Sequence, residues 1–147
     1  MKKLLLLPVV LFLSINLLSQ DSGFGLGVIL GEPTGLSAKM WTSERTAIDA
    51  GLAWSFIGAG YLHLHADVLA HSFALDVDRG QLPLYIGLGG KILMANNPEV
   101  GVRVPLGIAY LFDAAPLDFF LEIVPVLDLI PATTFNLQGG AGIRFYF

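Results

Sequence analysis

The chain has 147 residues, of which 54% are hydrophobic and only 14% are charged. This length suits one domain and not two, and soluble domains usually carry about 25% charged residues. Its 8 basic residues are outnumbered by 12 acidic ones, so the chain lacks the positive charge on which nucleic-acid binding depends. The composition argues against a typical soluble enzyme and excludes a nucleic-acid partner.

The first segment of the chain is expected to direct export. Lys2 and Lys3 precede a short apolar run over 4–18, as in a secretory signal peptide. We expect residues 1–20 to be this signal peptide and residues 21–147 to form the mature domain. Beyond the signal peptide, no stretch reaches the roughly 18 uninterrupted apolar residues of a membrane helix. The chain has no cysteine, which excludes a lipid anchor on cysteine and a disulfide framework.

The mature chain alternates between apolar and polar residues with a period of two, which indicates β-strands. Breaks rich in Gly, Pro, Asn, Asp and Ser separate the alternating segments. Eight strand-and-turn units of about 16 residues each fit membrane-crossing strands of roughly 9–11 residues with short connections. The eight expected strands cover 24–30, 36–42, 47–56, 61–73, 82–94, 100–112, 117–129 and 137–147.

One face of the predicted sheet is apolar, and the other is polar or small. In the 100–112 segment, Val102 and Val104 share one face and Arg103 lies on the other. Many of the 17 glycines share the polar face. The interior of an eight-stranded barrel is barely wide enough for side chains, so small residues there would offset long ones. The pattern predicts an all-β fold, a closed antiparallel eight-stranded up-and-down transmembrane β-barrel with its polar face inside.

Aromatic residues gather where the two membrane–water interfaces would lie. Aromatic girdles at both interfaces are expected of a transmembrane barrel. Trp54 and Phe56 would form the outer rim. The periplasmic rim would comprise Phe24, Tyr110, Phe112, Phe119, Phe145 and Phe147.

Four segments carry a resemblance to known proteins. The C-terminal Gly-Ile-Arg-Phe-Tyr-Phe, with Ile143, Phe145 and Phe147 in phase, is similar to the strand signal that the barrel-assembly machinery reads. With the segments 47–54, 62–67 and 101–107, the chain resembles small outer-membrane barrels of the OmpA transmembrane-domain type, within a family of unassigned function. The resemblance implies a bacterial outer-membrane location, with the lipid bilayer and the assembly machinery as partners.

The chain departs from OmpA itself in two respects. The sequence ends at Phe147, so we expect no periplasmic peptidoglycan-binding domain. The four outer connections are short, whereas adhesins and receptors of this size display long ones. Both departures argue against a recognition function, and a ligand of the outer loops stays open. We expect a monomer.

Charged residues of opposite sign are expected to meet on the inner face. An isolated buried ion is very costly, so these side chains should pair with one another and fill the barrel. A filled interior favours a structural or membrane-organising role. The same ionisable groups would also suit a narrow channel for small solutes or protons, and this alternative function stays open. The predicted network comprises Lys39, Asp49, Asp67, Lys91, Arg103, Asp118, Glu122 and Arg144, with Asp128 as a further candidate.

Three histidines share one face of the 61–73 segment with Asp67. A strand rise of about 3.3 Å puts His63 and His71 roughly 26 Å apart, too far for one metal ion. A site on the pair His63 and His65 is the remaining metal alternative. We expect both to be polar residues of the interior, with no metal and no other cofactor.

An enzyme that modifies lipid A is the least favoured alternative. Such an activity needs a nucleophile within hydrogen-bond reach of a base. Ser72 follows His71, but neighbours in a strand point to opposite faces, and the chain has no Gly-x-Ser-x-Gly motif. We therefore expect no catalytic residues and no enzymatic activity.

Overall fold

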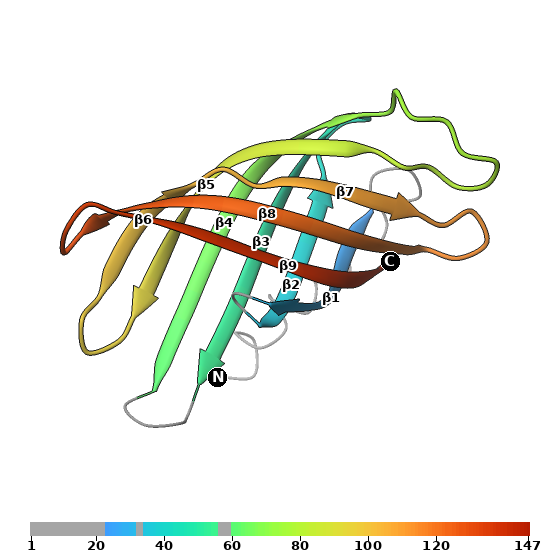
Figure 1. Cartoon of the computed structure of the whole chain (residues 1–147). Helices are drawn as coiled ribbons and strands as arrows, with labels where there is room; N and C mark the ends of the chain where they lie inside the picture. The colour runs from blue at the N-terminus through green and yellow to red at the C-terminus, as the bar shows by residue number, and fades with distance from the viewer. Residues whose placement is uncertain (1–22, 32–33, 56–59) are drawn as a thin grey trace, which may run out of the picture.

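The computed structural model describes residues 23–31, 34–55 and 60–147, and every regular element among them is a β-strand. In this part of the chain, no helix is long and apolar enough to cross a membrane. Figure 1 shows long, twisted strands arranged around a common interior. The strands are β1 (Phe24–Gly31), β2 (Gly35–Trp41), β3 (Thr46–Ser55), β4 (Tyr61–Ser72), β5 (Leu84–Met94), β6 (Glu99–Arg103), β7 (Leu106–Leu111), β8 (Leu117–Ile130) and β9 (Thr134–Tyr146).

All nine strands pair antiparallel and join into one closed sheet (Figure 1). β1 pairs with β9, where Val28 lies opposite Ile143, so the first strand meets the last. β6 and β7 both lie between β5 and β8 and together occupy one position in the sheet. The closed sheet therefore has eight positions, and the predicted antiparallel order of strands is confirmed.

The sixth strand of the closed sheet differs from the sequence prediction. The predicted strand over 100–112 is divided into β6 and β7, with Val104 and Pro105 between them. Pro105 has no N–H to donate to a neighbouring strand, and the regular pairing is interrupted there. Alternation continues across the interruption, because Arg103 and Pro105 are buried while Val102 is 39% exposed. The prediction of one unbroken strand is wrong, and the predicted inner and outer faces are confirmed.

Two other strand boundaries differ from the prediction by more than one residue. β5 begins at Leu84 instead of residue 82, so the connection over 73–83 is the longest in the described part of the chain. Gly80 in this connection adopts a φ of 72°, which favours glycine, and its N–H donates to the Asp113 carboxylate at 2.7 Å. β9 begins at Thr134 instead of residue 137, which leaves a connection of only 131–133 after β8.

The two faces of the closed sheet have opposite chemistry. The outer face exposes large apolar side chains from every strand, with Leu88 at 62% and Ile123 at 57%. The inner face buries polar and charged groups, and among the described residues five buried side chains form a small hydrophobic cluster between them. The cluster comprises Ile29, Leu69, Tyr85, Ala109 and Phe120. The core of the molecule is therefore predominantly polar and lies inside the closed sheet.

Glycines on the inner face make room for large side chains from neighbouring strands. A Cβ at Gly107 would lie 2.2 Å from the Tyr85 ring, and one at Gly142 would lie 2.3 Å from the Phe120 ring. Real Cβ atoms cannot approach other carbons so closely, so glycine is required for this packing. The predicted compensation between small and long interior residues is confirmed at these positions.

Candidate functional site

The eight charged residues predicted for the interior all lie on the inner face. Each occupies an inward position of its strand, because side chains alternate between the two faces, and none is more than 7% exposed. Seven of them form three ion-pair groups, and the eighth has different partners. The eight residues are Lys39, Asp49, Asp67, Lys91, Arg103, Asp118, Glu122 and Arg144.

The first group surrounds Arg103 of β6. Its Nε lies 3.0 Å from Asp67 Oδ1, and its Nη2 lies 3.6 Å from Glu122 Oε1. The Tyr85 hydroxyl donates to Glu122 Oε2 at 2.8 Å. One guanidinium thus joins β4 to β8, and a phenol from β5 supports the second acid. Tyr85 was not among the predicted site residues, although its inward phase on β5 could have identified it.

The second group surrounds Arg144 of β9. Its guanidinium lies 3.6 Å from an oxygen of Asp49 and 3.6 Å from an oxygen of Asp118. Its Nε donates to Ser37 Oγ at 3.0 Å, and its guanidinium carbon lies 3.8 Å from the centre of the Phe120 ring. Arg144 therefore holds β2, β3 and β8 against β9 through contacts with four side chains.

The third group surrounds Lys91 of β5, toward the other end of the interior. Lys91 Nζ lies 2.8 Å from Asp128 Oδ1 and 3.2 Å from Glu99 Oε2. Asn136 Nδ2 donates to Asp128 Oδ2 at 2.6 Å. Asp128 lies on the inward phase of β8, is 3% exposed and joins the charged residues of the interior through Lys91.

Lys39 of β2 departs from the predicted pairing. Its Nζ lies 2.9 Å from His71 Nε2 and 4.3 Å from the centre of the Trp41 ring. Asp49 lies opposite Lys39 in the β2–β3 pairing but contacts Arg144 instead. Among the described residues, no carboxylate lies within ion-pair distance of Lys39. The prediction that every interior charge pairs with an opposite charge is therefore wrong for Lys39, which an imidazole and an aromatic face hold.

The three histidines of β4 are buried and point inward, as predicted. The His63 and His65 rings are 5.8 Å apart, whereas His71 contacts Lys39. The neighbours of His65 differ from those expected. One ligand atom each of Asp49, His65 and Asp67 lies within 4.8 Å of the other two.

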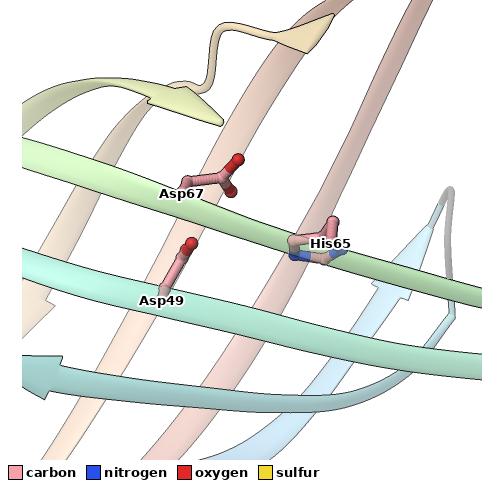
Figure 2. Close-up of side chains that lie close together, drawn as sticks. All are labelled: Asp49, His65 and Asp67. Atoms are coloured by element: carbon pink, nitrogen blue, oxygen red, sulfur yellow. The ribbon is translucent and has the colours of Figure 1, made fainter. Parts of the chain in front are cut away.

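Figure 2 shows the origin of this group of three. Asp67 and His65 project from the same strand, and Asp49 projects toward Asp67 from the neighbouring one. Asp49 and Asp67 are direct partners in the β3–β4 pairing. Sequence reasoning compared residues along one strand and therefore did not find Asp49 as a neighbour of His65. Among the described residues, these three form a group of acidic and histidine side chains close enough together to be candidate metal ligands.

The proposed assembly-signal residues lie on the outer face. Ile143, Phe145 and Phe147 are 43%, 48% and 53% exposed, and the two phenyl rings contact each other with their centres 5.4 Å apart. Other residues of the predicted aromatic rims also reach the outer surface. Phe112, Phe119 and Trp54 are exposed, Phe24 and Tyr110 are half-buried, and Phe56 lies outside the described residues.

Two serines, Ser37 and Ser72, lie in different surroundings. Ser37 is buried, and its Oγ accepts a hydrogen bond from Arg144. Ser72 is exposed on the outer face, opposite to the inward-pointing His71. Ser72 and His71 therefore do not form a dyad, in agreement with the alternation of the strand.

Comparisons of the chain with protein-family models, with curated proteins and with solved structures found no match. The resemblance to OmpA-type barrels thus stays a prediction from the sequence. The chemistry of the two faces and the groups inside the closed sheet are the observations that bear on function.

Proposed function

We propose that the protein is a small bacterial outer-membrane β-barrel of the OmpA transmembrane type, with a structural or membrane-organising role. One observation carries the proposal, namely that apolar side chains cover the outside of the closed sheet while charged side chains fill its inside. A water-soluble barrel would turn its apolar face inward. A lipid environment reverses that preference, because hydrocarbon surrounds the outer face.

The dimensions of the strands support a membrane location. β4, β5 and β8 contain 12, 11 and 14 residues, enough for the roughly 9–11 residues that a tilted strand needs to cross the bilayer. Their outer positions are apolar, as at Val68, which is 59% exposed. The expected signal peptide over 1–20, which lies outside the described residues, would supply the export that this location requires.

The filled interior supports a structural role. Arg103 and Lys39 are each only 1% exposed, and Phe120 is fully buried. The ion pairs and hydrogen bonds cross the interior between segments far apart in sequence, such as Arg144 and Ser37, which are separated by 107 residues. Ion pairs and hydrogen bonds of this kind hold the strands in one register, and the side chains that form them occupy the space that a pore would need.

Cell fractionation and gel mobility test the location. We expect the protein to be recovered with outer membranes, and the unheated protein to migrate faster on a denaturing gel than the heated one. A chain without residues 1–19 should stay in the cytoplasm. Recovery of the processed chain in the soluble periplasm would overturn the proposal.

A narrow path for protons or small solutes is the second candidate function. One observation favours it, since polar groups follow one another through the interior from Lys91 and Asp128 toward Lys39 and His71. Conductance across planar bilayers separates the two candidates. A structural role predicts no steady current, and a steady open current through the wild-type protein would favour the channel.

A further inference from the structure

The interior holds more buried acid than its cations neutralise. Lys39, Lys91, Arg103 and Arg144 are the buried cations, and the buried acids are Asp49, Asp67, Asp118, Glu122 and Asp128. Two carboxylates share each guanidinium. A region with surplus buried carboxylate must gain either a proton or another cation, because unpaired buried charge is very costly.

The surplus is concentrated where β3 pairs with β4. Asp49 and Asp67 lie opposite each other there, although like charges in direct opposition destabilise a sheet. Asp49 Oδ1 and Asp67 Oδ2 are buried and have no hydrogen-bond partner among the described residues, whereas Asp67 Oδ1 lies 3.0 Å from Arg103 Nε. Orphaned buried acceptors are rare in proteins and call for a physical explanation.

An imidazole completes this group. His65 is 8% exposed, and its Nδ1 is also buried without a hydrogen-bond partner in the described part of the chain. Figure 2 shows its ring beside the two carboxylates. Its position depends on Gly51 of β3, because a Cβ there would lie 2.1 Å from His65 Cε1. A glycine is thus required for the ring to lie beside the two acids.

We propose that Asp49, His65 and Asp67 bind one divalent transition-metal ion of the class of Zn²⁺ or Mn²⁺. Two carboxylates and one imidazole are ligands that such ions accept. The ion would add positive charge between two aspartates that each share a guanidinium with a second acid. The proposal concerns the inside of the closed sheet and does not depend on the membrane role proposed above.

The geometry needs little adjustment to close around the ion. The three ligand atoms lie within 4.8 Å of one another, and atoms bound to one Zn²⁺ at about 2.0–2.2 Å lie up to roughly 4 Å apart. Side-chain movements of less than about 1 Å would suffice. Arg103 contacts Asp67 Oδ1 and leaves Oδ2 for the metal, so the guanidinium orients the ligand from outside the coordination sphere.

Metal analysis of the folded wild-type protein tests the site first. The full mature chain would be refolded in detergent, treated with EDTA, and dialysed against Zn²⁺ or Co²⁺. We expect one ion per chain by elemental analysis, and visible absorption bands from the Co²⁺ form. If the folded protein retains no stoichiometric metal, the proposal is wrong, and the two aspartates share a proton instead.

Two histidine variants then locate the site. His65→Gln removes one ligand without breaking an ion pair, and we expect metal affinity to fall about tenfold or more. His63→Gln is the matched control, because His63 is a buried imidazole of the same strand face that lies outside the group of three. The control should bind within about twofold of wild type, and an equal loss in both variants would overturn the assignment.

A third variant keeps every ligand and disturbs only their placement. Gly51→Ala should displace the His65 ring and weaken metal binding about tenfold, with the two aspartates unchanged. The gel mobility of the unheated sample reports whether each variant has folded. Wild-type affinity in folded Gly51→Ala would show that His65 does not ligate the ion.

Discussion

Two buried cations of the interior, Arg103 and Lys39, are held in different ways. Arg103 joins two carboxylates, Asp67 and Glu122, which come from different strands. Among the described residues, Lys39 contacts the His71 imidazole and the faces of aromatic rings. A planar guanidinium with several donors can bridge two acids, whereas a single amine can rest against neutral groups. Loss of the arginine therefore leaves two buried carboxylates without a partner, whereas loss of the lysine leaves no unpaired charge beside it.

Replacement of Arg103 should have the largest effect. Arg103→Met leaves Asp67 and Glu122 without their guanidinium, and we expect the free energy of unfolding to fall by about 3–5 kcal/mol. Urea titration of the protein refolded in lipid vesicles would measure it. Arg103→Lys, which keeps the charge but loses the fork of donors, should lose less. A loss below about 1 kcal/mol in Arg103→Met would show that the neighbouring polar groups already satisfy both acids.

The adjacent residue tests the opposite face. Val102 is 39% exposed on the outside of β6, so Val102→Arg would place a guanidinium in hydrocarbon. We expect a loss of about 2–4 kcal/mol near the middle of the bilayer, measured by the same titration in vesicles. A change within about 0.5 kcal/mol, as at an ordinary water-exposed position, would contradict a lipid-facing outer surface.

Replacement of Lys39 should cost much less than replacement of Arg103. Lys39→Met keeps a similar length against Trp41 and removes one hydrogen bond to His71, so we expect a loss of about 1 kcal/mol. The difference between Lys39→Met and Arg103→Met is the informative quantity. Equal losses would mean that Lys39 neutralises the carboxylates of the interior from a distance.

The smallest effect on stability is expected at the chain end, where the consequence should be for assembly. Phe147→Ser leaves the backbone bond from Phe147 N to Phe24 O in place, so the unfolding free energy should change by less than about 1 kcal/mol. The amount inserted in cells should nevertheless fall. Phe135→Ser, at a 67% exposed aromatic residue on the same strand, is the control and should insert normally. Equal insertion of both variants would contradict the assembly-signal assignment.

The strands and their two faces could be predicted from sequence because both depend on local alternation. The inward positions of Lys91, Arg103 and Arg144 follow from a period of two along each strand. The interruption between β6 and β7 was not predicted, although Pro105 cannot donate a backbone hydrogen bond. Its apolar neighbours continue the alternation and so conceal the interruption.

The partners of the buried residues could not be predicted in the same way. Alternation places Lys39 and Asp49 inside but does not show that Asp49 meets Arg144 while Lys39 meets His71. Those contacts depend on how far each strand is shifted against its neighbours and on side chains that reach across the interior. A pairing rule applied strand by strand would have joined Lys39 to Asp49.

The sequence by itself therefore determined which residues lie inside, because each strand carries its own alternation of apolar and polar positions. Only the tertiary structure decided which of them meet. Strand register puts Asp49 opposite Asp67 and beside His65, and closure of the sheet brings Arg144 to Ser37 across 107 residues. Register and closure are properties of the whole sheet, which no single strand contains.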